Sequence, residues 1–206
     1  MNDPSMDTVK IHDAVQFLGA FDLGAFVVIG VPPRGQTDGS LPTRIGADAT
    51  IRSHTVIYAG NEIGDRFETG HGVTIREENR IGADVSVGTG SVVEHHVQIG
   101  SRVRIHSQAF IPEYSVLDDE CWIGPNVVIT NAKYPLSPDV KNQLRGAVVR
   151  RGAKVGANST LLPGIEIGRN ALVGAGSVVT RDVAPGDVVA GNPARVINTV
   201  GELPYE

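Results

Sequence analysis

The sequence contains little cysteine and no long hydrophobic run. One cysteine, Cys121, stands among 206 residues, which excludes an intramolecular disulfide framework and a multi-cysteine metal site. No stretch approaches about 18 uninterrupted apolar residues, and the first ten residues are polar and acidic. We therefore expect a cytoplasmic protein with neither a membrane span nor a secretion signal.

Positive charge and aromatic residues are also scarce. The formal net charge is −5, so the chain has no basic field for a phosphate backbone, and nucleic-acid binding is disfavoured. Aromatic residues make up only 5% of the chain, which argues against an aromatic-rich core. The 25 glycines, about 12% of the residues where about 7% is usual, point to many tight turns.

An aliphatic residue recurs every six positions over most of the chain. Between residues 45 and 129 only Thr69 interrupts this series, and the same period resumes in a shifted phase after residue 148. The members are Ile45, Ile51, Ile57, Ile63, Ile75, Ile81, Val87, Val93, Ile99, Ile105, Ile111, Leu117, Ile123 and Ile129, then Val149, Val155, Leu161, Ile167, Val173 and Val179. The phase shift predicts an inserted loop at residues 131–148.

A period of six fits neither an α-helix, whose apolar positions recur at three and four, nor a plain alternating strand. It fits a coil of short strands joined by tight turns, in which Gly, Asp and Asn supply the positive φ of the corners. β-Branched residues at the inward positions suit stacked parallel strands. A β-sandwich would instead show turn signals every 8–12 residues. The fold class is therefore all-β.

Several segments resemble the hexapeptide-repeat acyltransferases, namely the tandem six-residue units, GANSTLLPGIEIGRNALVGAGSVVTRDV and VVAGNPARVI. The resemblance covers residues 45–197. It implies a left-handed parallel β-helix, a homotrimer with active sites between subunits, and acetyl-CoA as co-substrate in a groove between neighbouring subunits. The segment IGPNVVITNAKYPLSP at residues 123–138 is similar to the FTN-x-x-YP segment of nucleotide-sugar N-acetyltransferases. The implied reaction is acetylation of an amino group on a nucleotide-linked amino-deoxy sugar.

Three segments are expected. Residues 1–44, which show no repeat on inspection, are expected to cap the open end of the β-helix with a strand or two, because its first coil would otherwise expose unpaired backbone. Residues 45–197 form the β-helix domain that carries loop 131–148, and residues 198–206 form a tail that frays. The first segment is too short for a separate nucleotide-binding domain.

The resemblance implies that three hexapeptides make one triangular turn, and such a coil of eighteen residues stacks positions eighteen apart at about 4.8 Å. Five of the six histidines then fall on or beside the second and third corners of the triangle. The third corner places Glu78, His96 and Tyr114 in one stack under the loop. A carboxylate at this spacing can accept the imidazole N–H and raise its basicity, which makes Glu78 and His96 a candidate general-base pair.

A rival base is His106, which lies beside Gln108 on the second corner. In the resembling enzymes this place carries amides that hold the amino group of the sugar. Several of those enzymes are thought to work without a side-chain base, since orientation of the amine contributes about 7–11 kcal/mol. Asn131, at the root of the loop, is a candidate oxyanion donor or substrate ligand. Lys133 and Tyr134 of the loop, with Tyr114, are candidate substrate-binding residues.

Acetyl-CoA needs a narrow groove for pantetheine and cations for its phosphates. Small residues on the second corner beyond the loop are candidates for the groove, and basic residues near the C-terminal end are candidates for the phosphates. The resemblance adds that the GAGSVV and AGNPAR segments line the CoA site. The candidate cofactor-binding residues are Gly156, Ala157, Gly174, Ala175, Arg181, Pro193 and Arg195.

Two alternative reactions stay open. O-acetylation of a sugar or antibiotic hydroxyl would make a histidine base nearly obligatory, because a neutral hydroxyl is a poor nucleophile. A zinc hydratase of the carbonic-anhydrase type needs three converging imidazoles, and its family pattern joins two histidines five apart. No two histidines of this sequence have that spacing, so no metal is expected.

Overall fold

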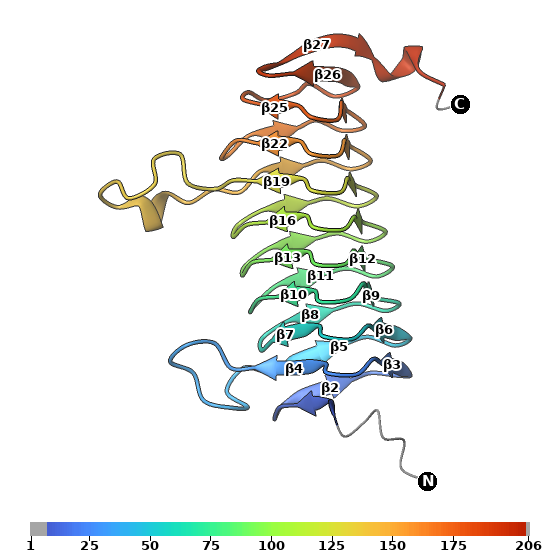
Figure 1. Cartoon of the computed structure of the whole chain (residues 1–206), viewed down its shortest axis with the longest axis vertical. Coiled ribbons are helices and arrows are strands. Elements are labelled where there is room, and N and C mark those ends of the chain that lie inside the picture. The colour runs from blue at the N-terminus through green and yellow to red at the C-terminus, as the bar shows by residue number, and fades with distance from the viewer. Residues whose placement is uncertain (1–7, 205–206) are drawn as a thin grey trace.

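Short strands wind into a triangular prism in the computed structural model, which describes residues 8–204 (Figure 1). Each coil contributes one strand to each of three sheets, and successive coils stack along the long axis of the molecule. Every strand pairs in parallel with the strand one coil away, apart from one antiparallel pair at the C-terminal end. This is the left-handed parallel β-helix expected from the repeat.

The three sheets contain nine, eight and ten strands. The nine-stranded sheet consists of β1 (Lys10–Ile11), β4 (Val28–Val31), β7 (Val56–Tyr58), β10 (Thr74–Ile75), β13 (Val92–Val93), β16 (Phe110–Ile111), β19 (Val128–Ile129), β22 (Thr160–Leu161) and β25 (Val178–Val179). The eight-stranded sheet consists of β2 (Val15–Phe17), β5 (Thr43–Ile45), β8 (Glu62–Ile63), β11 (Arg80–Ile81), β14 (Gln98–Ile99), β17 (Val116–Leu117), β20 (Val148–Val149) and β23 (Glu166–Ile167). The ten-stranded sheet consists of β3 (Phe21–Leu23), β6 (Ala49–Ile51), β9 (Glu68–Thr69), β12 (Ser86–Val87), β15 (Arg104–Ile105), β18 (Trp122–Ile123), β21 (Lys154–Val155), β24 (Leu172–Val173), β26 (Asp187–Gly191) and β27 (Ala194–Thr199).

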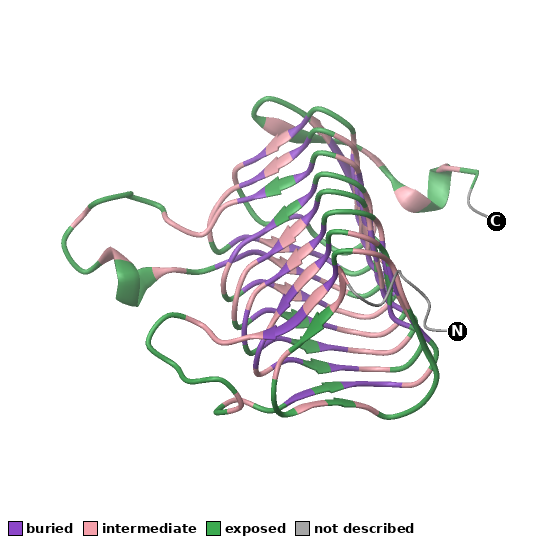
Figure 2. Cartoon of the chain, turned by 60° about the horizontal axis from the view of Figure 1, so that its bottom comes forward, coloured by how far each residue is buried: buried purple, intermediate pink, exposed green. Residues whose placement is uncertain are grey.

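The core is a set of aliphatic stacks inside the prism, coloured purple in Figure 2. Ile81 pairs with Ile99 across neighbouring strands, and both side chains are at most 4% exposed. The stacks consist of the residues of the six-residue series, so inward positions repeat at the register that the sequence predicts. After the loop the register resumes, because Val149 pairs with Leu117.

The β-helix begins at residue 10, which corrects the expectation of a separate cap over residues 1–44. Four strands, β1 to β4, belong to the same three sheets as the later coils, and Phe17 pairs with Ile45 in parallel. Ile11, Phe17, Leu23 and Ile29 are themselves six residues apart. An insertion at residues 32–42 hides this part of the series by shifting its phase. Residues 1–7 of the expected segment lie outside the described residues.

The C-terminal end is closed by β26 and β27, which form the antiparallel hairpin. The expected tail begins inside β27, and the 3-10 helix η3 (Val200–Glu202) follows it. The other 3-10 helix named here, η2 (Val140–Gln143), lies in the inserted loop. No helix within residues 8–204 is long and apolar enough to cross a membrane.

Buried asparagines hold the third corner, where the chain passes from the nine-stranded to the eight-stranded sheet. Asn79 is fully buried, its amide nitrogen donates to the Arg76 carbonyl at 2.8 Å, and its amide oxygen accepts the Val97 N–H at 2.7 Å. Asn61 makes the same two kinds of bond one coil earlier, to Tyr58 O and from the Asn79 N–H, and its amide nitrogen also donates to Arg76 O. These amides satisfy backbone groups that the tight turn leaves without strand partners.

We expect Asn79→Ala to lower the free energy of unfolding by about 2 kcal/mol, because it leaves a buried carbonyl and a buried N–H without partners. Chemical denaturation measures the loss. Gln98→Ala, at an exposed position one coil away, is the control and should change stability by less than about 0.5 kcal/mol. Equal stability of the two variants would show that the hydrogen bonds of the buried asparagines do not support the third corner.

Candidate active site

Glu78, His96 and Tyr114 form a column on the third corner, as their spacing predicts. Each has a positive φ, between 58° and 62°, which turns the chain and directs the side chain outward. His96 Nε2 lies 3.6 Å from Glu78 Oε2, and the His96 ring centroid lies 5.8 Å from that of Tyr114. The distance to Glu78 is too long for a hydrogen bond, so the carboxylate acts on the imidazole by charge and does not fix its tautomer.

The tautomer of His96 is instead coupled to His95. The two Nδ1 atoms are 2.8 Å apart, which is a hydrogen bond between one donor and one acceptor. Two imidazolium rings would place two N–H donors face to face, so at least one ring of the pair is neutral. A neutral imidazole beside a carboxylate is the form that accepts a proton from an attacking nucleophile.

A second column lies beside the first and includes two residues that the sequence interpretation did not nominate, His95 and Glu113. His95 Nε2 is 3.6 Å from Glu113 Oε1, and the Asn131 amide donates to Glu113 Oε2 at 2.6 Å. His95, Glu113 and Asn131 follow one another at intervals of eighteen residues. The spacing of eighteen is therefore enough to predict this second column from the sequence. The Asn131 amide is engaged with Glu113, and its role as an oxyanion donor stays a prediction.

The same edge carries two further carboxylates and one guanidinium. Arg76 makes two hydrogen bonds with Glu77, at 2.8 and 3.0 Å, and its third nitrogen lies 3.4 Å from Glu94. Burial opposes ionisation of Glu77, but the hydrogen bonds from Arg76, a backbone hydrogen bond and the charge of Arg76 together hold the pKa of Glu77 below its usual range. Burial raises the pKa of Glu94, with Arg76 opposing the shift. The third corner is therefore strongly acidic.

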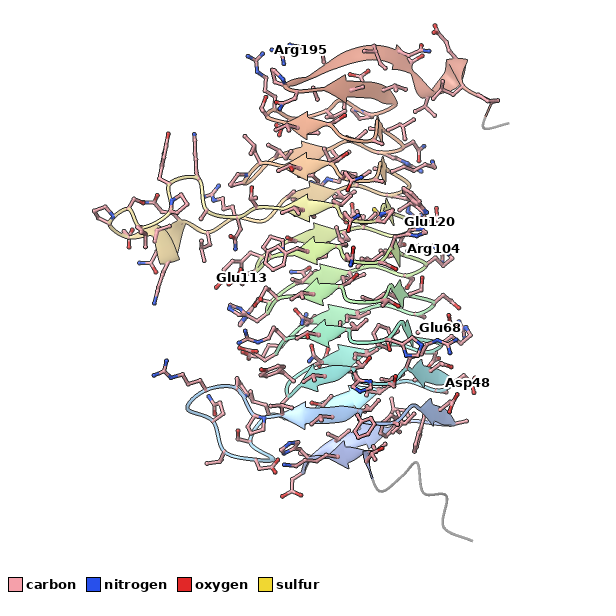
Figure 3. The ribbon with its side chains drawn as sticks, viewed as in Figure 1. Asp48, Glu68, Arg104, Glu113, Glu120 and Arg195 are labelled. Atoms are coloured by element: carbon pink, nitrogen blue, oxygen red, sulfur yellow. The ribbon has the colours of Figure 1, made fainter. Side chains whose placement is uncertain are left out.

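His106 lies on a different edge from His96. It follows β15 of the ten-stranded sheet, before the second corner, whereas His96 lies beyond the nine-stranded sheet. Figure 3 shows this separation, with Arg104 on one side of the prism and Glu113 on the other. The His106 ring packs 4.6 Å from Trp122, and its buried Nε2 has no hydrogen-bond partner within residues 8–204. Burial, followed by the charge of Arg104, lowers the pKa of His106.

The two candidate bases therefore cannot serve one substrate within one chain. Gln108 is exposed on the second corner with a φ of 60° and accompanies His106 along the chain, not Glu78 or Tyr114. Lys133 and Tyr134 line a separate hollow of about 340 Å³ with Arg145 and Gly164. The described lining of that hollow does not include Glu78, His96 or Tyr114.

The second corner continues through the coils beyond the loop, as predicted. The Asn158 N–H donates to Pro125 O at 2.9 Å, and the Gly176 N–H donates to Ala157 O at 2.8 Å. The adjoining glycines have a packing function: a Cβ on Gly156 would lie 2.5 Å from the backbone nitrogen of Ala175. The Gly174 N–H is likewise engaged, since it donates to Val189 O at 2.8 Å. Close stacking of the coils therefore explains both glycines without a cofactor.

Pro193 lies in the turn of the β26–β27 hairpin and Arg195 lies in β27, at the C-terminal end of the prism, where Figure 3 labels Arg195. The Gly191 N–H donates to the Ser177 hydroxyl, which follows the second corner of the previous coil, at 3.2 Å. Arg195 is exposed and donates to the Ala194 carbonyl at 2.9 Å. Arg181, in contrast, follows β25 at the third corner, so the structure does not bring it to the edge that carries Ala157 and Ala175.

Within residues 8–204, no group of three or more histidine, cysteine, aspartate or glutamate side chains is arranged to hold a metal ion. The His95 and His96 pair, with its carboxylates, is arranged for hydrogen bonding and charge pairing.

The model of the bacterial transferase hexapeptide family, described as six repeats, matches residues 80–113 and 146–181. These two stretches of the chain match the hexapeptide-repeat family. The two matched ranges lie on either side of the inserted loop, so they agree with the two phases of the repeat. The prism is correspondingly similar to the crystal structure of Arabidopsis UDP-N-acetylglucosamine acyltransferase, with a TM-score of 0.58, 17% identity, and coverage of 95% of this chain and 74% of that one.

Curated relatives of this hexapeptide-repeat chain are acetyltransferases of both kinds. Galactoside O-acetyltransferase of Lactococcus lactis is 36% identical over 89 residues, which is 40% of this chain and 42% of the relative. The 2,3,4,5-tetrahydropyridine-2,6-dicarboxylate N-acetyltransferase of Staphylococcus aureus is 43% identical over 56 residues, 27% of this chain and 23% of the relative. The chain thus spans less than half the length of these relatives.

Cys121 is predicted to be chemically inert in the folded protein. Its thiol is 1% exposed, and burial, with the charge of Asp118, raises its pKa to about 12. We expect no reaction with 5,5′-dithiobis(2-nitrobenzoate) at pH 8 in the native state and one thiol per chain after unfolding in guanidinium chloride. Rapid stoichiometric labelling of the native protein would contradict this and would reopen a covalent role for the thiol.

Proposed function

We propose that this protein transfers an acetyl group from acetyl-CoA to the amino group of a nucleotide-linked amino-deoxy sugar at the third corner. The observation that carries the proposal is the His95–His96 pair flanked by Glu78 and Glu113, with Nδ1 atoms 2.8 Å apart and each Nε2 3.6 Å from a carboxylate. The acetyltransferase relatives support the reaction class.

The proton movement follows from this arrangement. Bound acetyl-CoA supplies the acetyl group as a thioester. His96 accepts the proton that the acceptor amine loses as its nitrogen bonds to the acetyl carbon, and Glu78 stabilises the resulting imidazolium by charge. The bond between that carbon and the thiol sulfur then breaks, and the leaving thiolate takes up a proton. His95 holds the His96 ring in place through the Nδ1–Nδ1 hydrogen bond.

The acidity of the third corner favours an amine over a hydroxyl acceptor. Four carboxylates, Glu77, Glu78, Glu94 and Glu113, lie on this stretch of the edge, and Arg76 pairs with two of them. An edge with this charge attracts a protonated amine and has no comparable effect on a neutral hydroxyl. O-acetylation is the second candidate, because one of the two relatives is an O-acetyltransferase.

Acetyl-CoA is assigned to the second corner near the C-terminal end. Ala157 and Ala175 leave this edge free of bulky side chains, as a narrow pantetheine chain requires, and Arg195 offers a guanidinium at the end of the edge. Arg181 is assigned instead to the third corner of the last coil. Gly156 and Gly174 support the groove by allowing the coils to stack.

The second and third corners of different copies meet if the nine-stranded sheet forms the subunit contact. Its outward positions are mostly apolar, with Phe110 and Val128 exposed by 36% and 39%, whereas the other two sheets present charged residues. The loop also presents Leu136, which is 97% exposed. Packing of this sheet around a threefold axis would bring the second-corner edge of one subunit beside the third-corner edge of the next. We therefore propose a homotrimer with active sites between subunits.

His96→Ala is expected to lower acetyl transfer to an amino-sugar nucleotide at least 100-fold, because it removes the proton acceptor. Thiol release from acetyl-CoA measures the rate with paired acceptors that carry an amine or a hydroxyl at the same position. His54→Ala, on the second corner of an early coil, is the control and should keep the parental rate. Loss with His106→Ala but not with His96→Ala would move the base to the second corner. Transfer to the hydroxyl acceptors alone would establish the second candidate function.

Phe110→Glu is expected to convert the trimer into monomers, because it places charge at the centre of the apolar sheet face. Sedimentation velocity measures the oligomeric state, and circular dichroism verifies the fold. Ser86→Glu, at an outward position of the ten-stranded sheet, is the matched control and should remain trimeric. A parental protein that sediments as a monomer at micromolar concentration would overturn the subunit arrangement.

A further inference from the structure

Both inserted loops leave the prism at the third corner. Residues 32–42 join β4 to β5, and the later insertion joins β19 to β20, so each links the nine-stranded to the eight-stranded sheet. Figures 1 and 2 show the two loops on the same side of the prism. They are five coils apart, or about 24 Å at the usual strand spacing. The third-corner column of Gly60, Glu78, His96 and Tyr114 lies between them.

The first loop is a fixed wall. Asp38 accepts a hydrogen bond from the His12 ring at 2.9 Å and another from the Asp13 N–H at 3.1 Å. Within the loop, the Ser40 hydroxyl donates to Thr37 O at 2.8 Å. These bonds tie the loop to the first coil and present Leu41 and Pro42 toward the third corner.

A hollow of about 520 Å³ lies between this wall and the catalytic column. Leu41 and Pro42 line one end and Tyr114 another, so its ends are apolar or aromatic. Glu78 and His96 line the corner side, and the outward residues of the eight-stranded sheet line the remaining side. This size and mixture suit a monosaccharide, whose ring has apolar faces and polar edges.

Two arginines give the sheet side of the hollow a charge opposite to that of the corner side. Arg80 follows Glu78 by two residues, about 6.6 Å along a strand, and its nearest carboxylate contact is Glu62, at 3.8 Å. Arg44 lies two coils earlier in the same outward column and makes no ion pair with any described residue within 4.0 Å. The hollow therefore combines a carboxylate that attracts an amine with guanidinium groups that attract an anion.

We propose that this hollow is the acceptor subsite and that Arg44 and Arg80 bind an anionic group, a phosphate or a carboxylate, of an amino sugar whose amine lies at Glu78 and His96. The proposal rests on the proposed function for the fate of the amine. Leu41 and Pro42 of the first loop pack against the sugar ring, and Gln98 hydrogen-bonds its hydroxyls. Acceptor specificity is thus set partly by the first loop and by the eight-stranded sheet.

Isothermal titration without acetyl-CoA tests the proposal with four probes. Glucosamine 1-phosphate and muramic acid carry an amine together with a phosphate or a carboxylate, whereas glucosamine and glucose 1-phosphate each lack one of the two groups. We expect glucosamine 1-phosphate or muramic acid, the two-group probes, to bind at least tenfold more tightly than glucosamine and glucose 1-phosphate. Whichever of the two-group probes binds more tightly identifies the anion as a phosphate or a carboxylate. No measurable binding, or equal binding of all four, would overturn the proposal.

Variants locate the binding. Arg44→Gln and Arg80→Gln should each weaken the preferred two-group probe at least fivefold and leave glucosamine unchanged, while Arg169→Gln, at an exposed site outside the hollow, should change neither. Asp38→Asn, which loosens the wall, should weaken all the sugars by a similar factor. Unchanged affinity in both arginine variants would remove the anion from this hollow. The titrations contain no acetyl-CoA, so they measure sugar binding alone. If the protein transferred no acetyl group, the proposed function would fail and the binding results would still stand.

Discussion

The structure depends on the ladder of backbone hydrogen bonds between successive coils. The Arg80 N–H donates to Val97 O at 3.1 Å, the Gly82 N–H donates to Ile99 O at 2.8 Å, and comparable bonds recur from coil to coil. This ladder fixes the offset of eighteen residues between paired positions. Each inward aliphatic residue therefore stacks on another, and the core is continuous along the prism. A shift of one residue would turn the whole set outward, so apolar burial and backbone pairing enforce the same register.

The same register organises the chemistry at the corners. A corner residue with positive φ directs its side chain away from the core, and the next coil repeats the geometry about 4.8 Å away. Charges of opposite sign then meet in exposed ladders, as in the 2.8 Å pair of Arg102 and Glu120 on the first corner. On the third corner, the same stacking brings His95 and His96 beside Glu113 and Glu78. One structural rule thus produces both solvated ion pairs and a cluster of imidazoles and carboxylates, and the residue types decide between them.

The insertions give this repetitive surface its shape. Pairing of Val148 with Val116 shows that the ladder closes again after the longer loop, so the loop interrupts the chain without interrupting the prism. The shorter loop leaves the parallel pairing of Thr43 with Val15 equally intact. The shorter loop lines the hollow at the third corner with Leu41 and Pro42, next to Glu78 and His96. Enclosure and charge therefore coincide at the third corner, which is where the acceptor site is proposed.

The sequence by itself determined the repeat, the fold class and the contents of each corner. The resemblance to hexapeptide-repeat acyltransferases implies a turn of eighteen residues, and that spacing predicts one column of Glu78, His96 and Tyr114. The first coil escaped detection because residues 32–42 displace the phase and Phe17 occupies an aliphatic position. Only the tertiary structure decided how the side chains on these columns meet: that His96 is hydrogen-bonded to His95 and not to Glu78, that Asn131 is engaged by Glu113, and that His106 lies on another edge. The physical reason is that register depends on backbone pairing and burial, which the sequence pattern encodes, whereas rotamers and the direction of each loop depend on contacts between distant residues.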